Sequence, residues 1–97
     1  MAYRLSVRAE EDVIGIFLEG AAQFGLLQAE HYHELLKLRL VFLSNHPEAA
    51  RMRTEIDPAV RILPAIAHLI VYSVDAQGDV FVIRVLHGRE DWLSQDL

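Results

Sequence analysis

The sequence predicts a small α+β domain in which a helical hairpin packs on one face of a mostly antiparallel sheet. Two observations lead to this prediction. Apolar residues alternate as in strands near the start of the chain and through its last third, and residues 9–43 have helical spacing. The expected order is β-α-α-β-β-β, and 97 residues suffice for a single domain with one core, covering residues 1–97.

The first strand is expected at residues 3–7, where polar and apolar residues alternate. From Ala9 the spacing becomes helical, and Gly25 is a suitable end because glycine tolerates a positive φ. We expect a weak N-cap, since neither Arg8 nor Ala9 can accept a hydrogen bond from the free amides. Asp12 is expected on the solvent side, opposite an apolar stripe. The stripe comprises Val13, Phe17, Ala21 and Phe24, and Ile14 flanks it.

A second helix is expected at residues 27–43, before Asn45-His46-Pro47. Because one or two residues join the helices, they must fold back as an antiparallel hairpin. Leu38 and Val41 fall outside the apolar face of this helix, and with Trp92 they suggest more exposed apolar surface than a monomer tolerates. The sequence therefore indicates a protein partner. The apolar face comprises Ala29, Tyr32, Leu35, Leu36, Leu40, Phe42 and Leu43.

The last third of the chain predicts the rest of the sheet. Residues 48–59 are expected to form an irregular connection with a turn at Asp57-Pro58. Three strands follow at residues 60–63, 68–74 and 80–86, and residues 75–79 form a hairpin loop between the last two.

The charge balance disfavours direct binding of nucleic acid. The net charge is −5, the pI is near 5.4, and Lys37 is the only lysine beside eight arginines. Proteins that neutralise phosphates usually carry a basic stripe instead. The sequence has no cysteine, no apolar run that would span a bilayer and no signal-peptide pattern at its start. We therefore expect a cytoplasmic protein without a membrane partner.

The five histidines do not predict a metal site. His31 and His33 are two residues apart in a helix, which points them about 200° away from each other. His46, His68 and His87 come from a loop and two strands without an acidic partner at ligand spacing. The sequence has no phosphate-binding loop, nucleophile elbow or metalloprotease motif. We expect neither a metal nor a cofactor.

Cationic and imidazole side chains on the strands are the candidate functional residues. They are Arg61, His68, Arg84, His87 and Arg89. A structural role for Arg84, such as an ion pair with Glu55, and a functional role are both open, and the same holds for Arg61. His87 and Arg89 leave the last strand where side chains become free, which favours a partner contact. Trp92 either folds back onto the core, the favoured role in so small a chain, or anchors a partner.

The end of the chain resembles a family signature. Arg84-Val85-Leu86-His87-Gly88-Arg89, followed by Asp91-Trp92, is similar to the ending of ParE-type toxins of the RelE/ParE superfamily. The resemblance extends over nearly the full length, and the RelE/ParE-like fold that it implies agrees with the periodicity. Further matching positions are Phe24, Gly25, Gln28, Ala29, Tyr32, Asn45, His46, Pro47, Glu55, Ile56, Val60, Arg61, His68, Ile70 and Tyr72.

The resemblance implies that the chain is the toxin of a type II toxin–antitoxin system. Such toxins are neutralised in a hetero-oligomer by a small ParD-like antitoxin, whose C-terminal part wraps the toxin through amphipathic helices. ParE members inhibit DNA gyrase, whereas RelE members cut mRNA on the ribosome. The two branches share one fold, so the fold does not decide between these activities.

Residue chemistry favours binding over catalysis. Cleavage of RNA needs a general base, a general acid and cationic stabilisation of the phosphorane. The RelE branch supplies these with lysines, arginines and a C-terminal tyrosine. Here Lys37 is the lone lysine, Pro64 stands where that branch carries an arginine, and the tail offers Trp92. We therefore expect a gyrase inhibitor that is not an enzyme.

Two alternatives stay open: a ribosome-dependent mRNA endoribonuclease that uses Arg61, Arg84 and His87, and a non-toxic member kept for its antitoxin complex. Under the favoured interpretation Leu38 and Val41 line the antitoxin groove. The candidates for contact with the target or the antitoxin are Arg61, Arg84, His87, Arg89, Asp91 and Trp92.

Overall fold

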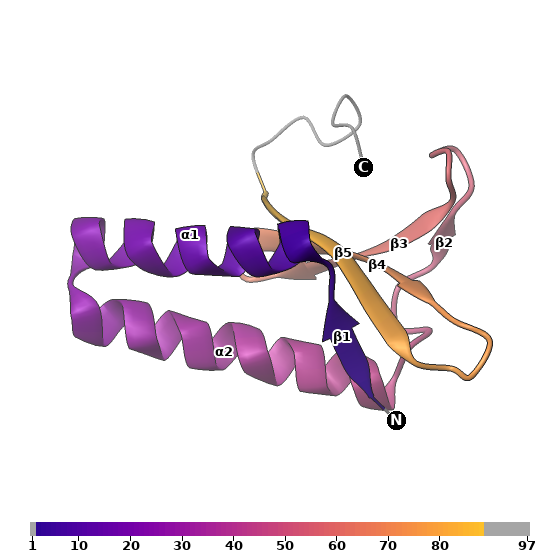
Figure 1. Ribbon diagram of the computed structural model, residues 1–97, viewed down its shortest axis with the longest axis horizontal. Coiled ribbons are helices and arrows are strands. Elements are labelled where there is room, and N and C mark those ends of the chain that lie inside the picture. Colours follow the sequence, from indigo (N-terminus) through magenta and orange to yellow (C-terminus); the bar gives the residue numbers. More distant parts are fainter. Residues whose placement is uncertain (1, 89–97) are drawn as a thin grey trace.

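The structure is a computed structural model that describes residues 2–88 of the chain. Two helices form one layer and a five-stranded sheet forms the other (Figure 1). The elements are β1 (Tyr3–Leu5), α1 (Val7–Phe24), α2 (Leu26–Asn45), β2 (Met52–Arg53), β3 (Val60–Ala65), β4 (His68–Val74) and β5 (Val80–His87). The predicted fold class is confirmed. The short strand β2, in the connection that we expected to be irregular, is an addition.

The sheet brings the two ends of the described chain together. Its order is β1-β5-β4-β3-β2, with β1 parallel to β5 and the other neighbours antiparallel. β4 and β5 lie in the middle of the sheet, and their register shifts at Val71/Tyr72. Because β1 pairs with β5, the residues that follow β1 lie beside the second half of β5.

Ser6 begins α1 and also joins it to the sheet. Its Oγ accepts a hydrogen bond from the Ala9 amide at 2.9 Å and donates one to the Ile83 carbonyl at 2.7 Å. The expected weak N-cap is therefore wrong. The strand ends at Leu5 and the helix begins at Val7, so a serine rather than Arg8 or Ala9 occupies the cap.

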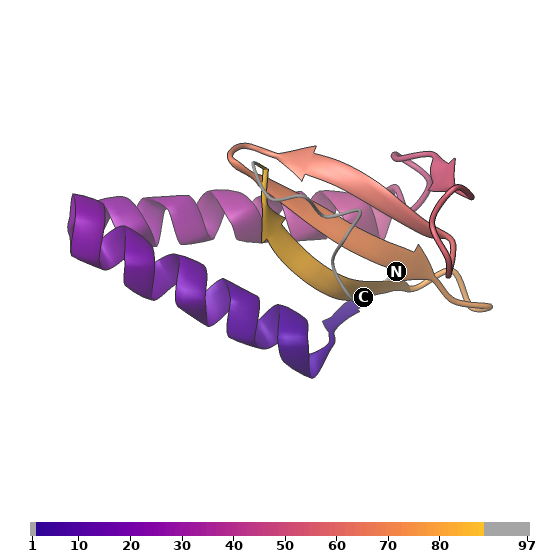
Figure 2. The same cartoon turned by 90° about the horizontal axis from the view of Figure 1, so that it is seen from above.

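Gly25 alone joins the two helices. Its φ is +91°, its amide donates to the Ala21 carbonyl, and its own carbonyl accepts from the Ala29 amide. A left-handed conformation of this kind is accessible to glycine without steric cost. The predicted helical hairpin is thus confirmed, and its closed end reaches well past the sheet (Figure 2).

The core lies between the hairpin and the sheet. From α2 it contains Leu36, Leu40 and Leu43, which pack against Ile70 and Tyr72 of β4. A second, smaller group on the sheet consists of Val60, Ile62, Val71 and Leu86. The closed end of the hairpin has less to pack against. Phe24 of the predicted α1 stripe lies at this end and is accordingly exposed, and Ile14, in the middle of α1, is exposed as well.

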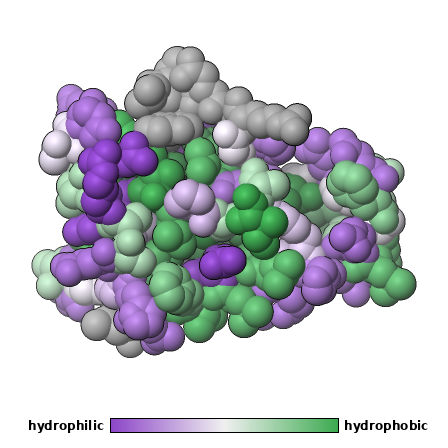
Figure 3. Space-filling view, turned by 180° about the vertical axis from the view of Figure 1, so that it is seen from behind, coloured by the Kyte–Doolittle hydropathy of each residue, from purple (hydrophilic) through white to green (hydrophobic). Residues whose placement is uncertain are grey.

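The outer face of α2 carries large apolar side chains among its charged residues. Leu38 is 62% exposed, Val41 is 42% exposed and Phe42 is 43% exposed. We define these three side chains as the outer stripe of α2. Phe42 was expected on the inner face, so that assignment is wrong. Figure 3 shows apolar side chains gathered along the lower part of the molecule, where α2 runs.

Candidate partner-binding site

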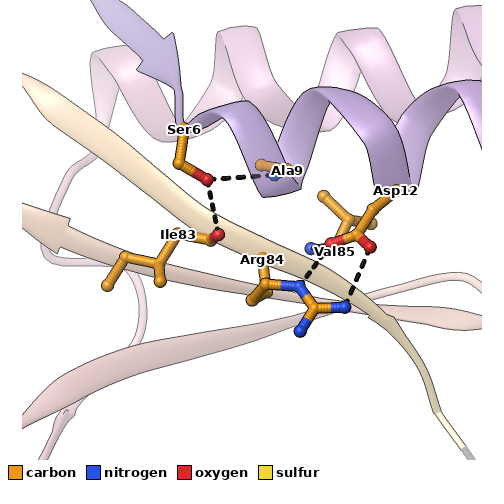
Figure 4. A network of polar contacts seen from close by, with 6 residues as sticks. All are labelled: Ser6, Ala9, Asp12, Ile83, Arg84 and Val85. Atoms are coloured by element: carbon orange, nitrogen blue, oxygen red, sulfur yellow. Dashed lines mark hydrogen bonds and ion pairs between the residues drawn. The ribbon is translucent and has the colours of Figure 1, made fainter. Parts of the chain in front are cut away.

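Arg84 serves to join α1 to β5. Its Nε and Nη2 donate to the two carboxylate oxygens of Asp12 at 2.7 and 2.9 Å, and Asp12 also accepts from the Val85 amide at 2.9 Å (Figure 4). The exposed fractions of the two side chains are 12% and 16%, so the pair is largely shielded from water. Asp12 therefore does not lie on the solvent side of α1, as we expected, but against the sheet.

The suggested Arg84–Glu55 ion pair is also wrong. Glu55 lies 3.7 Å from Arg51 and 3.6 Å from Arg53 instead. A hydrogen bond to its own backbone amide, followed by these two guanidinium groups, lowers the pKa of the Glu55 carboxyl. The sequence held a signal for the true partner of Arg84. Asp12 interrupts the buried side of α1, and Arg84 interrupts an apolar strand. Because charges in apolar surroundings are normally paired, these two residues are candidates for one ion pair.

Arg61 contacts the connection before β2 and not a free surface. Its Nη1 donates to the Ala50 carbonyl. The neighbouring Tyr72 hydroxyl donates to the Pro47 carbonyl at 2.9 Å and accepts from the Ala50 amide at 3.3 Å. Burial raises the pKa of Tyr72. Arg61 and Tyr72 together hold residues 47–50 against the sheet.

The residues of the ribonuclease alternative are not brought into one group. Arg61 pairs across the sheet with Tyr72, whereas His87 pairs with His68 at the other end of β4. Arg84 precedes His87 by three positions in β5, which separates their backbones by about 10 Å.

His87 belongs instead to a group with Tyr32 and His68. The Tyr32 hydroxyl and His68 Nδ1 share a hydrogen bond of 2.6 Å, and the rings of His68 and His87 lie 5.3 Å apart, edge to face. Tyr32 also accepts from the Ala67 amide, and burial raises its pKa. Tyr32 was expected only as part of the apolar face of its helix. The available signal was a hydroxyl on the apolar face of a helix, which needs a partner when buried.

A cavity of about 350 Å³ opens next to this group. Its walls come from the facing sides of α1 and α2, and its inner end is formed by the β3–β4 turn and the end of β5. The lining is mostly apolar. It comprises Val13, Ile16, Phe17, Glu19, Gly20, Gln23, Phe24, Gln28, Ala29, Tyr32, His33, Leu36, Ala67, His68 and His87.

The remaining candidates divide into two sets. Leu38 and Val41 are exposed on α2, on the side that the periodicity indicated. Arg89, Asp91 and Trp92 lie outside the described residues.

Within residues 2–88, no group of three or more histidine, cysteine, aspartate or glutamate side chains is arranged to hold a metal ion. Neither α1 nor α2 is both long enough and apolar enough to cross a bilayer.

The fold recurs in a protein of known structure. A chain of the solved structure described as "Chromosomal ParDE TA system from P. aeruginosa" superimposes with a TM-score of 0.76 at 17% identity. The match covers 90% of this chain and 95% of that chain.

Comparison of sequences gives the family. The model of the ParE toxin of the type II toxin–antitoxin system parDE matches residues 3–92, and this chain belongs to that family. Toxin ParE1 of Mycobacterium tuberculosis is 34% identical over 89 residues, which cover 92% of this chain and 91% of that toxin. Toxin ParE1 of Caulobacter vibrioides is 29% identical over 85 residues, with coverages of 88% and 86%.

Proposed function

We propose that this ParE toxin acts by binding DNA gyrase and inhibiting it, without chemistry of its own. Three observations support the proposal. The chain belongs to the ParE family. Arg84 is engaged with Asp12 and Arg61 with Ala50, so these guanidinium groups serve packing. His87 lies apart from both along the sheet.

We further propose that a ParD-like antitoxin holds the toxin inactive in a hetero-oligomer by covering the outer stripe of α2. The observation that carries this proposal is the row of exposed apolar side chains on α2. Neighbouring large apolar side chains on a surface mark an interaction site, and Leu38, Val41 and Phe42 are open to solvent. An amphipathic helix laid along this stripe would bury all three, as in other helix-in-groove complexes. The complex would form in the cytoplasm, where gyrase acts.

The activity is tested with purified toxin in a gyrase supercoiling and cleavage assay, with and without antitoxin, beside a translation assay. We expect gyrase inhibition that the antitoxin reverses, and intact mRNA. Loss of full-length mRNA during translation would instead establish the ribonuclease alternative. Absence of both effects at toxin concentrations that stop growth would refute the proposal.

The antitoxin surface is tested with the variants Leu38→Glu and Val41→Glu in calorimetric titrations. Each places a charge in the proposed interface, so we expect a loss of affinity of about a hundredfold, or about 2.7 kcal/mol. Ile14→Glu is the matched control, because Ile14 is exposed to a similar degree but lies on α1. Equal losses for the α1 and α2 variants would contradict the assignment to the outer stripe.

A further inference from the structure

The cavity between the helices is separate from the outer stripe of α2. It lies on the opposite side of that helix, where Ala29, Tyr32 and Leu36 face α1. Its volume of about 350 Å³ falls in the range of pockets that take up small ligands or anchoring side chains. The proposed antitoxin surface does not include it.

The lining of the cavity indicates the shape of its occupant. Phe17 and Phe24 contribute aromatic walls, and Gly20 and Ala29 face each other across the hairpin with small side chains that leave the space open. The inner end is polar, because Tyr32, His68 and His87 converge there. A cavity with apolar walls and a few polar groups at one end suits a large side chain that is mainly apolar, above all an aromatic one.

The charge around the cavity indicates the kind of segment that carries this side chain. The described residues that line the cavity include one carboxylate and no lysine or arginine. Glu19 lies on the cavity wall itself. Opposite charges around an interface speed association and exclude wrong partners. The negative charge at the cavity therefore favours a basic partner and disfavours an acidic peptide or an anionic lipid surface.

Exposed apolar side chains extend this surface beyond the cavity. Leu18, Phe24 and Leu26 are all more than half exposed at the closed end of the hairpin. A run of apolar side chains next to a pocket, bordered by carboxylates, is typical of a protein-binding site.

We propose that the cavity is a second protein-binding site, which receives a large apolar side chain from a basic amphipathic segment of a partner protein. Phe17 and Phe24 would hold the apolar body, the Tyr32–His68–His87 end would contact its polar edge, and Glu19 would face a flanking lysine or arginine. The proposal goes beyond the proposed function, because it does not depend on the antitoxin contact at the outer stripe or on gyrase.

The test uses two synthetic amphipathic peptides and the full-length chain labelled with ¹⁵N. One peptide is built from leucine and lysine around a single tryptophan, and the other replaces every lysine by glutamate. Titrations followed by NMR should show that the basic peptide shifts the amide signals of Gly20, Ala29 and Ala67. We expect its affinity to exceed that of the acidic peptide by about tenfold or more. Equal affinities would overturn the charge argument.

Matched variants locate the site. Glu19→Lys should weaken the basic peptide about tenfold, whereas Glu34→Lys, with the same change of net charge on an exposed position away from the cavity, should weaken it far less. Phe24→Ala should weaken it, whereas Leu38→Ala, on the outer stripe, should not. Phe24 and Leu38 are 69% and 62% exposed, so neither variant should prevent folding. Equal effects within either pair, or a larger effect of Leu38→Ala, would overturn the proposal.

Discussion

The contact between Asp12 and Arg84 shows how a single pair of residues decides where a helix lies. The carboxylate accepts three hydrogen bonds, two from the guanidinium and one from the Val85 amide. These three hydrogen bonds give the largely buried carboxylate its partners. The pair therefore fixes the position of α1 over β5. Removal of one member leaves the other charge shielded from water, which is costly.

Asp12→Asn should therefore destabilise the fold by about 3 kcal/mol in urea unfolding. The control is Arg51→Gln, which removes an ion pair whose side chains are mainly exposed, and which should change the midpoint little. Similar midpoints for the two variants would show that the Asp12 contact does not hold α1 on the sheet.

The hydroxyl groups of Tyr32 and Tyr72 predict a loss of stability in alkali. Burial raises the pKa of Tyr32 and of Tyr72 above the ordinary value of 10.0. When folding raises the pKa of a group, that group contributes to the free energy of unfolding. The contribution is fully present below the pKa of the unfolded state and is lost as the pH rises through the pKa of the folded state. The free energy of unfolding should thus be level to about pH 10 and then fall by about 1.4 kcal/mol per pH unit for each tyrosine.

Tyr72→Phe should reduce this slope by about half, measured by urea unfolding between pH 8 and pH 11.5. The slopes and not the absolute stabilities are compared, because the variant also loses the hydrogen bonds to Pro47 and Ala50. Lys37 is the only lysine that titrates in this range. An unchanged slope would show that Tyr72 ionises freely in the folded protein.

The starts of the two helices are capped in different ways. Ser6 stands between the end of β1 at Leu5 and the start of α1 at Val7. Its hydroxyl caps α1 and also donates to the Ile83 carbonyl of the sheet. α2 begins directly after Gly25, whose carbonyl accepts a hydrogen bond from the Ala29 amide, and no side chain caps this start. The hairpin is attached to the sheet at the start of α1, and its closed end is exposed.

Ser6→Ala should lower the stability by about 2 kcal/mol, because both the cap and the bond to Ile83 are lost. Ser6→Thr retains a hydroxyl and should stay close to the parent. Ser6→Asp can still cap the helix but cannot donate to the Ile83 carbonyl, so thermal unfolding should place it between the other two. If aspartate matched threonine, the bond to Ile83 would contribute nothing.

The whole molecule is acidic, and its charge limits what it can bind. With a net charge of −5 the protein should show no saturable binding to short duplex DNA or single-stranded RNA at concentrations up to about 100 μM in about 150 mM salt. Fluorescence anisotropy of labelled oligonucleotides measures this. Binding that weakens steeply with salt would contradict the prediction and favour the ribonuclease alternative.

Much of the fold could be predicted because it depends on local patterns. The helical spacing of residues 9–43, the glycine at position 25 and the alternation in the strands each act within a few residues along the chain. The same local pattern placed Leu38 and Val41 outside the inner face of α2. Phe42 was misplaced because it lies at the border between the two faces, where a small rotation of the helix decides its exposure.

The candidate site was harder to predict, because its contacts join distant parts of the chain. Arg84 was matched with Glu55 since the sequence does not show which carboxylate the sheet order brings near. The true partner, Asp12, lies 72 positions away. Tyr32 and His68 are 36 positions apart, and only the packing of α2 on β4 makes them neighbours.

The sequence by itself thus determined the class of fold, the helical hairpin, the acidic character and the membership in the ParE family. The first three follow from composition and periodicity, and the family from the resemblance of the sequence to its members; all are properties of the chain before it folds. The tertiary structure alone decided that Arg84 serves packing, that Ser6 caps α1, and that a cavity opens between the helices. The physical reason is that β1 pairs with β5, and this pairing selects which distant groups meet.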